Sequence, residues 1–125
     1  MSAPNIRAIN DMAFDFHAAS LKAGWWKTLQ ADGTVDPHEV GTKIGLIHSE
    51  VSEAMEAFRK DAMDDHLTDR KGVEVEIGDA IIRLLDLAGA LRVDVGNAIY
   101  AKMAYNAARA DHKPEARAAV GGKKF

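Results

Sequence analysis

Two pairs of acidic residues, Glu50 with Glu53 and Glu76 with Asp79, are the part of this sequence best suited to chemistry. The residues of each pair are three apart, so on an α-helix their carboxylates point the same way. Two such pairs brought face to face would offer oxygen ligands to a hard divalent cation. A cation held in this way suits phosphate chemistry.

The apolar pattern places these pairs on two long helices. Asp36 is a suitable cap, Pro37 suits the first helical position, and Glu39 is spaced for a capping box. Apolar residues then recur at alternating spacings of four and three, which predicts a helix over about 37–60. The charged segment 61–70 predicts a loop. A second apolar row, at positions 73, 77, 81, 84, 88 and 91, predicts the next helix.

The two helices are expected to pack antiparallel through their apolar rows, because the connecting loop is short. At ~100° per residue, the first acidic pair lies roughly 80° and 140° from its row, and the second roughly 100° and 160°. These flanks then meet on one side of the hairpin at nearly the same height. Four carboxylates there would repel one another and raise their pKa values. Binding of Mg²⁺ or Mn²⁺ resolves that conflict.

The rest of the chain is also predicted to be helical. Apolar spacing predicts a helix from Pro4 to about Ala23 and another over about 95–109, and no segment alternates with a period of two. We therefore predict an all-α protein, an antiparallel bundle of about four helices. A single domain is expected over residues 1–110, followed by a flexible tail over 111–125.

Composition narrows the class of protein. The chain has 125 residues, is 47% hydrophobic and carries a net charge of −3, which argues against binding to a nucleic-acid polymer. It contains no cysteine, so thiolate catalysis and Cys-ligated zinc are excluded. No apolar run approaches the ~20 residues of a membrane span, and the first residues lack the core of a signal peptide. We expect a cytoplasmic protein without a membrane partner.

Further residues suit a phosphate or a nucleobase. Lys102, Asn106 and Arg109 share one face of the last helix and together suit phosphate oxygens, although a polar outer face has the same pattern. Arg83 follows Asp79 by four residues and is either an ion-pair partner of the acids or a phosphate contact.

Three ring-bearing residues leave alternatives open. Trp25 and Trp26 follow a glycine, and either cover the end of the core or stack on a nucleobase. His17 lies at the boundary of the first helix.

Two other interpretations of the acidic pairs remain. Most such pairs on helices form a solvated face, but neither Lys43 nor Arg59 has ion-pair spacing to the first pair. A di-iron centre needs Glu-x-x-His on two helices, whereas His48 precedes Glu50 and the second pair ends in Asp79. Iron is therefore disfavoured.

Three segments, residues 43–57, 76–83 and 102–106, resemble the MazG-like nucleotide pyrophosphohydrolases of the all-α NTP pyrophosphatase superfamily. Their sequences are KIGLIHSEVSEAMEA, EIGDAIIR and KMAYN, and they carry the E-x-x-E and E-x-x-D motifs of that superfamily. The resemblance covers nearly the whole chain. The paired acids with the downstream lysine and asparagine are its more specific part, and the glycine-lysine tail is not specific.

The resemblance implies Mg²⁺-dependent hydrolysis of an NTP or dNTP to the monophosphate and pyrophosphate, with Mn²⁺ as a substitute metal. It implies a homodimer, often a dimer of dimers, with sites near subunit contacts. The implied metal ligands and catalytic groups are Glu50, Glu53, Glu76 and Asp79, one of which also orients the attacking water. Lys102 and Asn106 would hold phosphates with help from Arg109 or Arg83, and His17 and Trp26 match nucleoside-contacting positions.

The chain departs from the family pattern at one point. Relatives often carry an extra acid before each motif, whereas Ser49 precedes Glu50 and Val75 precedes Glu76 here. The number of metal ions and the preferred base and sugar are therefore left open. The alternative class is a non-catalytic helical bundle that serves as an interaction module or a regulatory metal-binding module.

Overall fold

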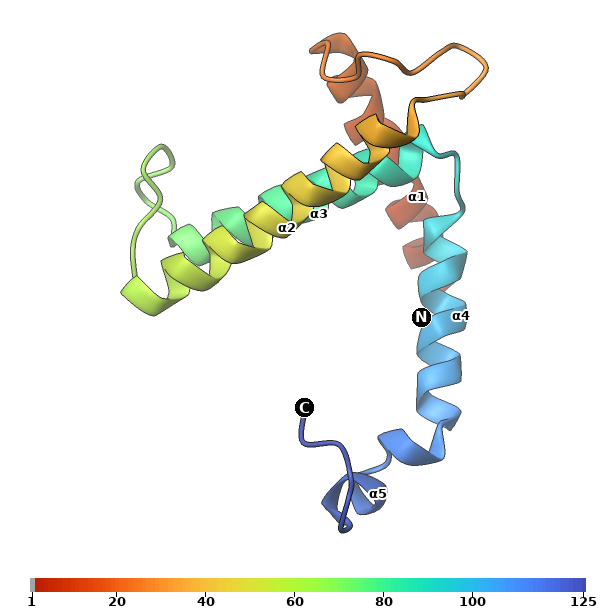
Figure 1. Ribbon diagram of the computed structural model, residues 1–125, viewed down its shortest axis with the longest axis vertical. Helices are drawn as coiled ribbons and strands as arrows, with labels where there is room; N and C mark the ends of the chain where they lie inside the picture. Colours follow the sequence, from red (N-terminus) through yellow and green to blue (C-terminus); the bar gives the residue numbers. More distant parts are fainter. Residues whose placement is uncertain (1) are drawn as a thin grey trace. The chain divides into compact units, whose positions relative to one another are not determined.

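The computed structural model describes residues 2–125, which are folded into helices (Figure 1). The elements are α1 (Ala3–Lys22), α2 (Pro37–Lys60), α3 (Gly72–Ala90), α4 (Val95–Ala108), the 3₁₀ turn η1 (Ala110–His112) and α5 (Pro114–Ala118). Within residues 2–125 the only β-type pairing is an isolated bridge between Met63 and Lys71. The all-α prediction is confirmed, and the four predicted helices are present.

The chain divides into two compact units. One contains the N-terminal residues to Asn10 together with Asp94–Phe125, and the other contains Asp11–Val93. Helix α1 contributes residues to both. The predicted domain boundary at residue 110 stays a prediction. Residues 111–125, predicted to be a tail, include α5 and an ion pair between Lys123 and Asp111.

In the first unit, Asn10 joins the start of α1 to the start of α4. Its Nδ2 donates to Asp94 Oδ1 at 2.8 Å, and its Oδ1 accepts from the Gly96 N–H at 2.8 Å. Asp94 also caps α4 by accepting from the Asn97 N–H. A Cβ at position 96 would lie 2.5 Å from the Ile6 carbonyl oxygen, so only glycine permits this close approach.

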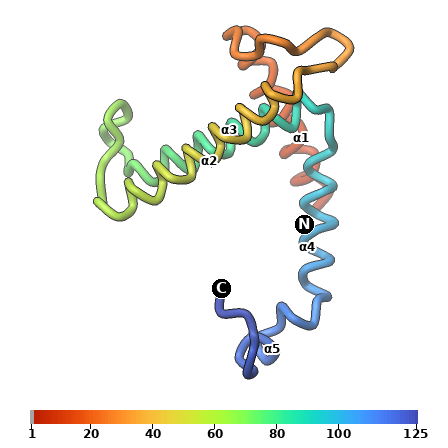
Figure 2. Tube along the Cα trace, viewed as in Figure 1, coloured from red at the N-terminus to blue at the C-terminus, as the bar shows by residue number. Residues whose placement is uncertain are grey.

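The second unit is built on a hairpin of α2 and α3, which lie side by side and antiparallel (Figure 2). Helix α2 begins as predicted, because the Asp36 side chain accepts from the His38 N–H and Pro37 occupies the first turn. It ends at Asp61, whose left-handed backbone turns the chain into the loop. The antiparallel hairpin that the short loop predicts is therefore present.

The contact face of the hairpin differs from the prediction. The predicted apolar row of α2 is largely exposed, with Val51 56% and Phe58 73% exposed, and on α3 Ile77, Ile81 and Leu84 are exposed as well. Of that row α2 buries Ile47, and it also buries Glu50, which lies outside the row. Small residues explain the rotation, because a Cβ at Gly72 would lie 3.1 Å from that of Ala57. Glu50 is therefore buried at the contact between the helices, Glu76 is half-buried, and Glu53 and Asp79 stay exposed.

The loop between α1 and α2 is held by Glu39. Its carboxylate accepts from the backbone N–H groups of Lys27, at 2.6 Å, and Thr28, at 2.7 Å, and from the Thr28 hydroxyl. The expected capping box is therefore wrong in its partner: Glu39 satisfies loop N–H groups instead of the cap's own N–H. These contacts fix the loop at Lys27 and Thr28, directly after Trp25 and Trp26.

Among residues 2–125, no helix is long and apolar enough to cross a membrane.

Candidate metal and nucleotide site

Three of the four predicted acids form a cluster at the hairpin contact. Glu50 from α2 and Glu76 and Asp79 from α3 each offer a carboxylate oxygen, and these oxygens lie within 4.8 Å of one another. Glu50 is 8% exposed, Glu76 is half-buried and Asp79 is exposed. Glu53 is exposed and stands outside this group of three, although its charge acts on Glu76. The structure thus brings Glu50 of the first pair to both members of the second, with Glu53 outside the group.

Arg83 is the cation in contact with this cluster. Its Nε donates to Glu50 Oε1 at 2.7 Å, and the Arg83 side chain is partly exposed. Of the two roles left open by the sequence, the ion pair is the one the structure contains. A guanidinium has five N–H donors, so Arg83 keeps others for an anion at the same place.

The pKa values of two carboxyl groups in the cluster are raised. Burial raises the pKa of Glu76 from 4.5 to about 7, and the neighbouring charges of Glu53, Glu50 and Asp79 act in the same direction. Burial also raises the pKa of Asp79, where Glu50 adds to the shift and Arg83 opposes it. The raised pKa values indicate that the positive charge near these carboxylates is too small to offset their burial and mutual repulsion.

This shift predicts how stability depends on pH. Because the folded state binds the Glu76 proton more tightly than the unfolded state, the free energy of unfolding should fall as pH rises from 4.5 to about 7. We expect a loss of about 2 kcal/mol, below the full linkage value because the carboxyl is partly solvated. Urea unfolding of metal-free protein at about pH 5 and about pH 8 measures it, and Glu76→Gln should flatten the dependence. Stability that rises over this interval would contradict the assigned environment of Glu76.

The residues present fit a hard divalent cation. The donors are carboxylate oxygens only, which Mg²⁺ and Mn²⁺ prefer, and they come from two helices held at fixed separation. A bound cation would also remove the repulsion that raises the pKa of Glu76. Glu50, Glu76 and Asp79 would be the ligands, with Glu53 within electrostatic reach.

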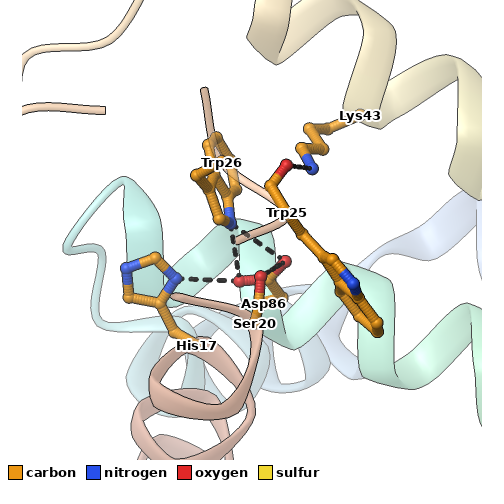
Figure 3. Close-up of polar contacts among 6 residues, drawn as sticks. All are labelled: His17, Ser20, Trp25, Trp26, Lys43 and Asp86. Atoms are coloured by element: carbon orange, nitrogen blue, oxygen red, sulfur yellow. Dashed lines mark hydrogen bonds and ion pairs between the residues drawn. The ribbon is translucent and has the colours of Figure 1, made fainter. Parts of the chain in front are cut away.

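A second polar group surrounds Asp86, which is 6% exposed on α3 (Figure 3). Its carboxylate contacts His17 Nδ1 at 2.8 Å and accepts from the Ser20 hydroxyl at 2.9 Å. It also accepts from Trp26 Nε1 at 3.0 and 3.2 Å. Close packing of α1 on α3 makes this possible, since a Cβ at Gly89 would lie 2.5 Å from that of His17. His17 and Trp26 are thereby fixed in place by one buried carboxylate.

A cavity of about 290 Å³ is lined in part by this group. Its lining residues are Trp25, Trp26, Lys43, Leu46, Ile82, Arg83 and Asp86. Arg83 lines the cavity and also pairs with Glu50, so the cavity and the cluster adjoin. On α2, Leu46 precedes Glu50 by one helical turn, about 6 Å along the axis. Along α2, about one helical turn therefore separates the cavity lining from the cluster.

The remaining predicted residues belong to the first unit. Lys102 and Asn106 lie on α4, and the Lys102 ammonium sits 4.8 Å from the centre of the Tyr105 ring. Arg109 was expected on the same helix face, but α4 ends at Ala108 and Arg109 adopts an extended backbone. Its guanidinium pairs with Asp111, Nε to Oδ1 at 2.9 Å, which holds the pKa of Asp111 well below its usual range. Among the described side chains, buried Asn106 Oδ1 accepts no hydrogen bond.

Sequence reasoning singled out neither Asp86 nor Lys43 as part of the site. Lys43 donates from Nζ to the Trp25 carbonyl oxygen at 2.6 Å and lies 4.7 Å from the centre of the Trp26 ring. Asp86 did carry a usable signal, because it is a lone charge within the apolar run Leu84–Ala90. Lys43 carried none, since its contacts are with a loop distant in sequence.

Comparison of the chain with protein-family models, with curated proteins and with solved structures gave no match.

Proposed function

We propose that this protein is a Mg²⁺-dependent nucleoside triphosphate pyrophosphohydrolase, which converts an NTP or dNTP to the monophosphate and pyrophosphate. The single observation that carries the proposal is the cluster of Glu50, Glu76 and Asp79, with oxygens within 4.8 Å, one turn of helix from a cavity with two tryptophans. It is supported by the resemblance of the acidic motifs to MazG-like enzymes. Such an activity would remove unwanted nucleotides from the cellular pool.

Each part of the site has a role in this proposal. The three clustered carboxylates would bind Mg²⁺, which supplies positive charge against the charge that develops on the phosphate oxygens. Arg83 would contact the phosphate chain with its remaining N–H groups, and the cavity would hold the nucleoside. Glu53 is exposed and its charge acts on Glu76, so we propose it as the group that accepts a proton from the water that would attack the α-phosphorus. Phosphate contacts from Lys102 and Asn106 stay a prediction of the sequence resemblance.

The experiment is a screen of canonical and modified NTPs and dNTPs for pyrophosphate release, with Mg²⁺, with Mn²⁺ and with a chelator. The proposal expects release of pyrophosphate and monophosphate with either metal and none with the chelator. Metal-independent release, or release of orthophosphate instead, would overturn it. The alternative, a regulatory metal-binding module, expects a thermal shift with Mg²⁺ and no product.

We further propose that the protein is a homodimer, or a dimer of dimers, in which a second copy covers the exposed apolar rows of the hairpin. The rows contain Ile44, Val51, Met55 and Phe58 on α2 and Ile77, Ile81 and Leu84 on α3, all exposed. Apolar side chains in rows along two helices are typical of a face that another helix pair covers. An identical hairpin supplies matching rows, and a twofold axis would repeat the contact.

The dimer is expected to dissociate when charge is placed in these rows. Val51→Glu with Phe58→Glu should raise the dimer dissociation constant at least about 100-fold, because each charge loses solvent when the face is covered. Sedimentation equilibrium measures this constant. Ser52→Glu is the matched control, since Ser52 is exposed and its hydroxyl bonds only within the helix, to the His48 carbonyl. Wild-type protein that stays monomeric at high concentration would contradict the proposal.

A further inference from the structure

In the cavity beside the acid cluster, the side-chain groups that are free to hydrogen-bond are donors only. Asp86 is the acidic side chain among its lining residues. Its two oxygens already take contacts from His17, Ser20 and, twice, Trp26. A carboxylate has about four lone-pair sites, so Asp86 has none left for a ligand. The same contacts also occupy the indole nitrogen of Trp26.

The polar side chains that remain are Lys43 and Arg83, both of which only donate. Lys43 uses one N–H on the Trp25 carbonyl oxygen and keeps the others. Arg83 uses Nε on Glu50. A ligand in the cavity therefore meets N–H donors and apolar or aromatic faces, and no side-chain acceptor with free capacity.

The two cations lie at different places relative to the acid cluster. Arg83 contacts Glu50, whereas Lys43 precedes Glu50 by seven residues on α2, about 10 Å along the axis. Phosphate groups at the cluster would meet Arg83, and the part of the ligand farther away would meet Lys43. The indole of Trp25, 54% exposed, turns away from Asp86 in Figure 3 and offers a face for stacking.

We propose that this cavity selects nucleotides whose base carries a carbonyl oxygen where a close analogue carries an amino group, with Lys43 as the donor to that oxygen. An amino group at that position would set donor against donor and leave the remaining N–H groups of Lys43 without an acceptor. The choice of a nucleotide as ligand rests on the proposed function. The preference among bases follows from the hydrogen-bond inventory of the cavity.

The test uses matched pairs of monophosphates and full-length protein in the presence of a chelator, so that neither metal binding nor hydrolysis enters. Inosine monophosphate is compared with adenosine monophosphate, and UMP with CMP, by isothermal titration calorimetry. The carbonyl-bearing member of each pair should bind at least about tenfold more tightly. Equal affinity, preference for the amino-bearing member, or no binding of any of the four would overturn the inference.

Two variants separate the donor from the stacking face. Lys43→Met keeps the length of the side chain and should bring the ratio within each pair close to one, while binding persists. Trp25→Ala should weaken both members of a pair to the same degree and leave the ratio unchanged. A ratio that survives Lys43→Met would show that Lys43 is not the donor and would overturn the assignment.

The outcome is distinguishable from failure of the proposed function. Selective binding of carbonyl-bearing monophosphates without pyrophosphate release would support this inference and contradict the hydrolase. Equal rates of pyrophosphate release from the corresponding triphosphates, ITP with ATP and UTP with CTP, would support the hydrolase and contradict this inference.

Discussion

Glu76→Gln and Asp79→Asn are each expected to lower Mg²⁺-dependent pyrophosphate release by about 10²–10³-fold, without loss of stability in the metal-free protein. Both residues belong to the cluster whose oxygens lie within 4.8 Å, and the pKa of each is raised. Amides of the same size remove the repulsion at neutral pH, so the free energy of unfolding should stay the same or rise. If the role of the residue were structural, its substitution would instead lower the free energy of unfolding.

The measurement therefore has two readouts, initial rate of pyrophosphate release and urea unfolding, both at about pH 8, above the raised pKa of Glu76. Glu74→Gln is the matched control, because Glu74 is exposed on the same helix and pairs with Arg70 at 2.6 Å. We expect the control to keep its rate. Activity near the wild-type level in either cluster variant would remove that carboxylate from the proposed site.

Asp86→Ala is expected to cost about 3 kcal/mol or more of stability, the largest loss that we predict for a single side chain. The substitution leaves the Trp26 indole nitrogen, the Ser20 hydroxyl and His17 without their shared acceptor in a buried place. A hydrogen bond to a charged group contributes about 1.5–3 kcal/mol, and an unsatisfied buried donor costs about 1–3 kcal/mol. Urea unfolding measures the difference.

Smaller substitutions in the same group should rank in order. Ser20→Ala removes one donor and leaves the carboxylate with its others, so its cost should be about 1 kcal/mol. Asp86→Asn keeps the size but turns one acceptor into a donor, so its cost should fall between those of Ser20→Ala and Asp86→Ala. If Asp86→Ala costs no more than Ser20→Ala, the carboxylate does not organise this group.

Local signals predicted the helices and the clustering of the acids well. Asp36 and Pro37 marked the start of α2, and it begins there because the Asp36 carboxylate accepts from the His38 N–H. The charged segment after Lys60 marked the loop, and the antiparallel hairpin followed from its length. The spacing of Glu76 and Asp79 placed both on one face of α3, where the structure brings them to Glu50.

The rotation of the two helices was not predictable from their apolar rows. Large side chains such as Val51 and Phe58 remain exposed, while the contact uses Ala57, Gly72 and the Glu50–Arg83 ion pair. An apolar row indicates a face that packs against another surface, but it does not identify that surface. We propose that a second copy of this chain covers the rows. Sequence alone places the acids beside the contact, whereas the fold buries Glu50 at it and half-buries Glu76, whose pKa burial raises.

Contacts between distant segments were likewise beyond reach of sequence patterns. The sequence left open whether Trp26 covers the core or stacks on a base, and the hydrogen bond to Asp86, sixty residues away in sequence, fixes it as a buried residue. Glu39 was expected in a capping box but holds the loop near Thr28. Such partners depend on how α1 and the loop meet the hairpin, which no local periodicity encodes.

The most direct test of the proposed reaction is mass spectrometry of the products formed by wild-type protein with Mg²⁺ and a nucleoside triphosphate in water labelled with heavy oxygen. If water attacks the α-phosphorus beside Glu50, Glu76 and Asp79, one labelled oxygen should appear in the monophosphate and none in the pyrophosphate. Label in the inorganic product, or no metal-dependent product from any nucleotide tested, would contradict the assignment.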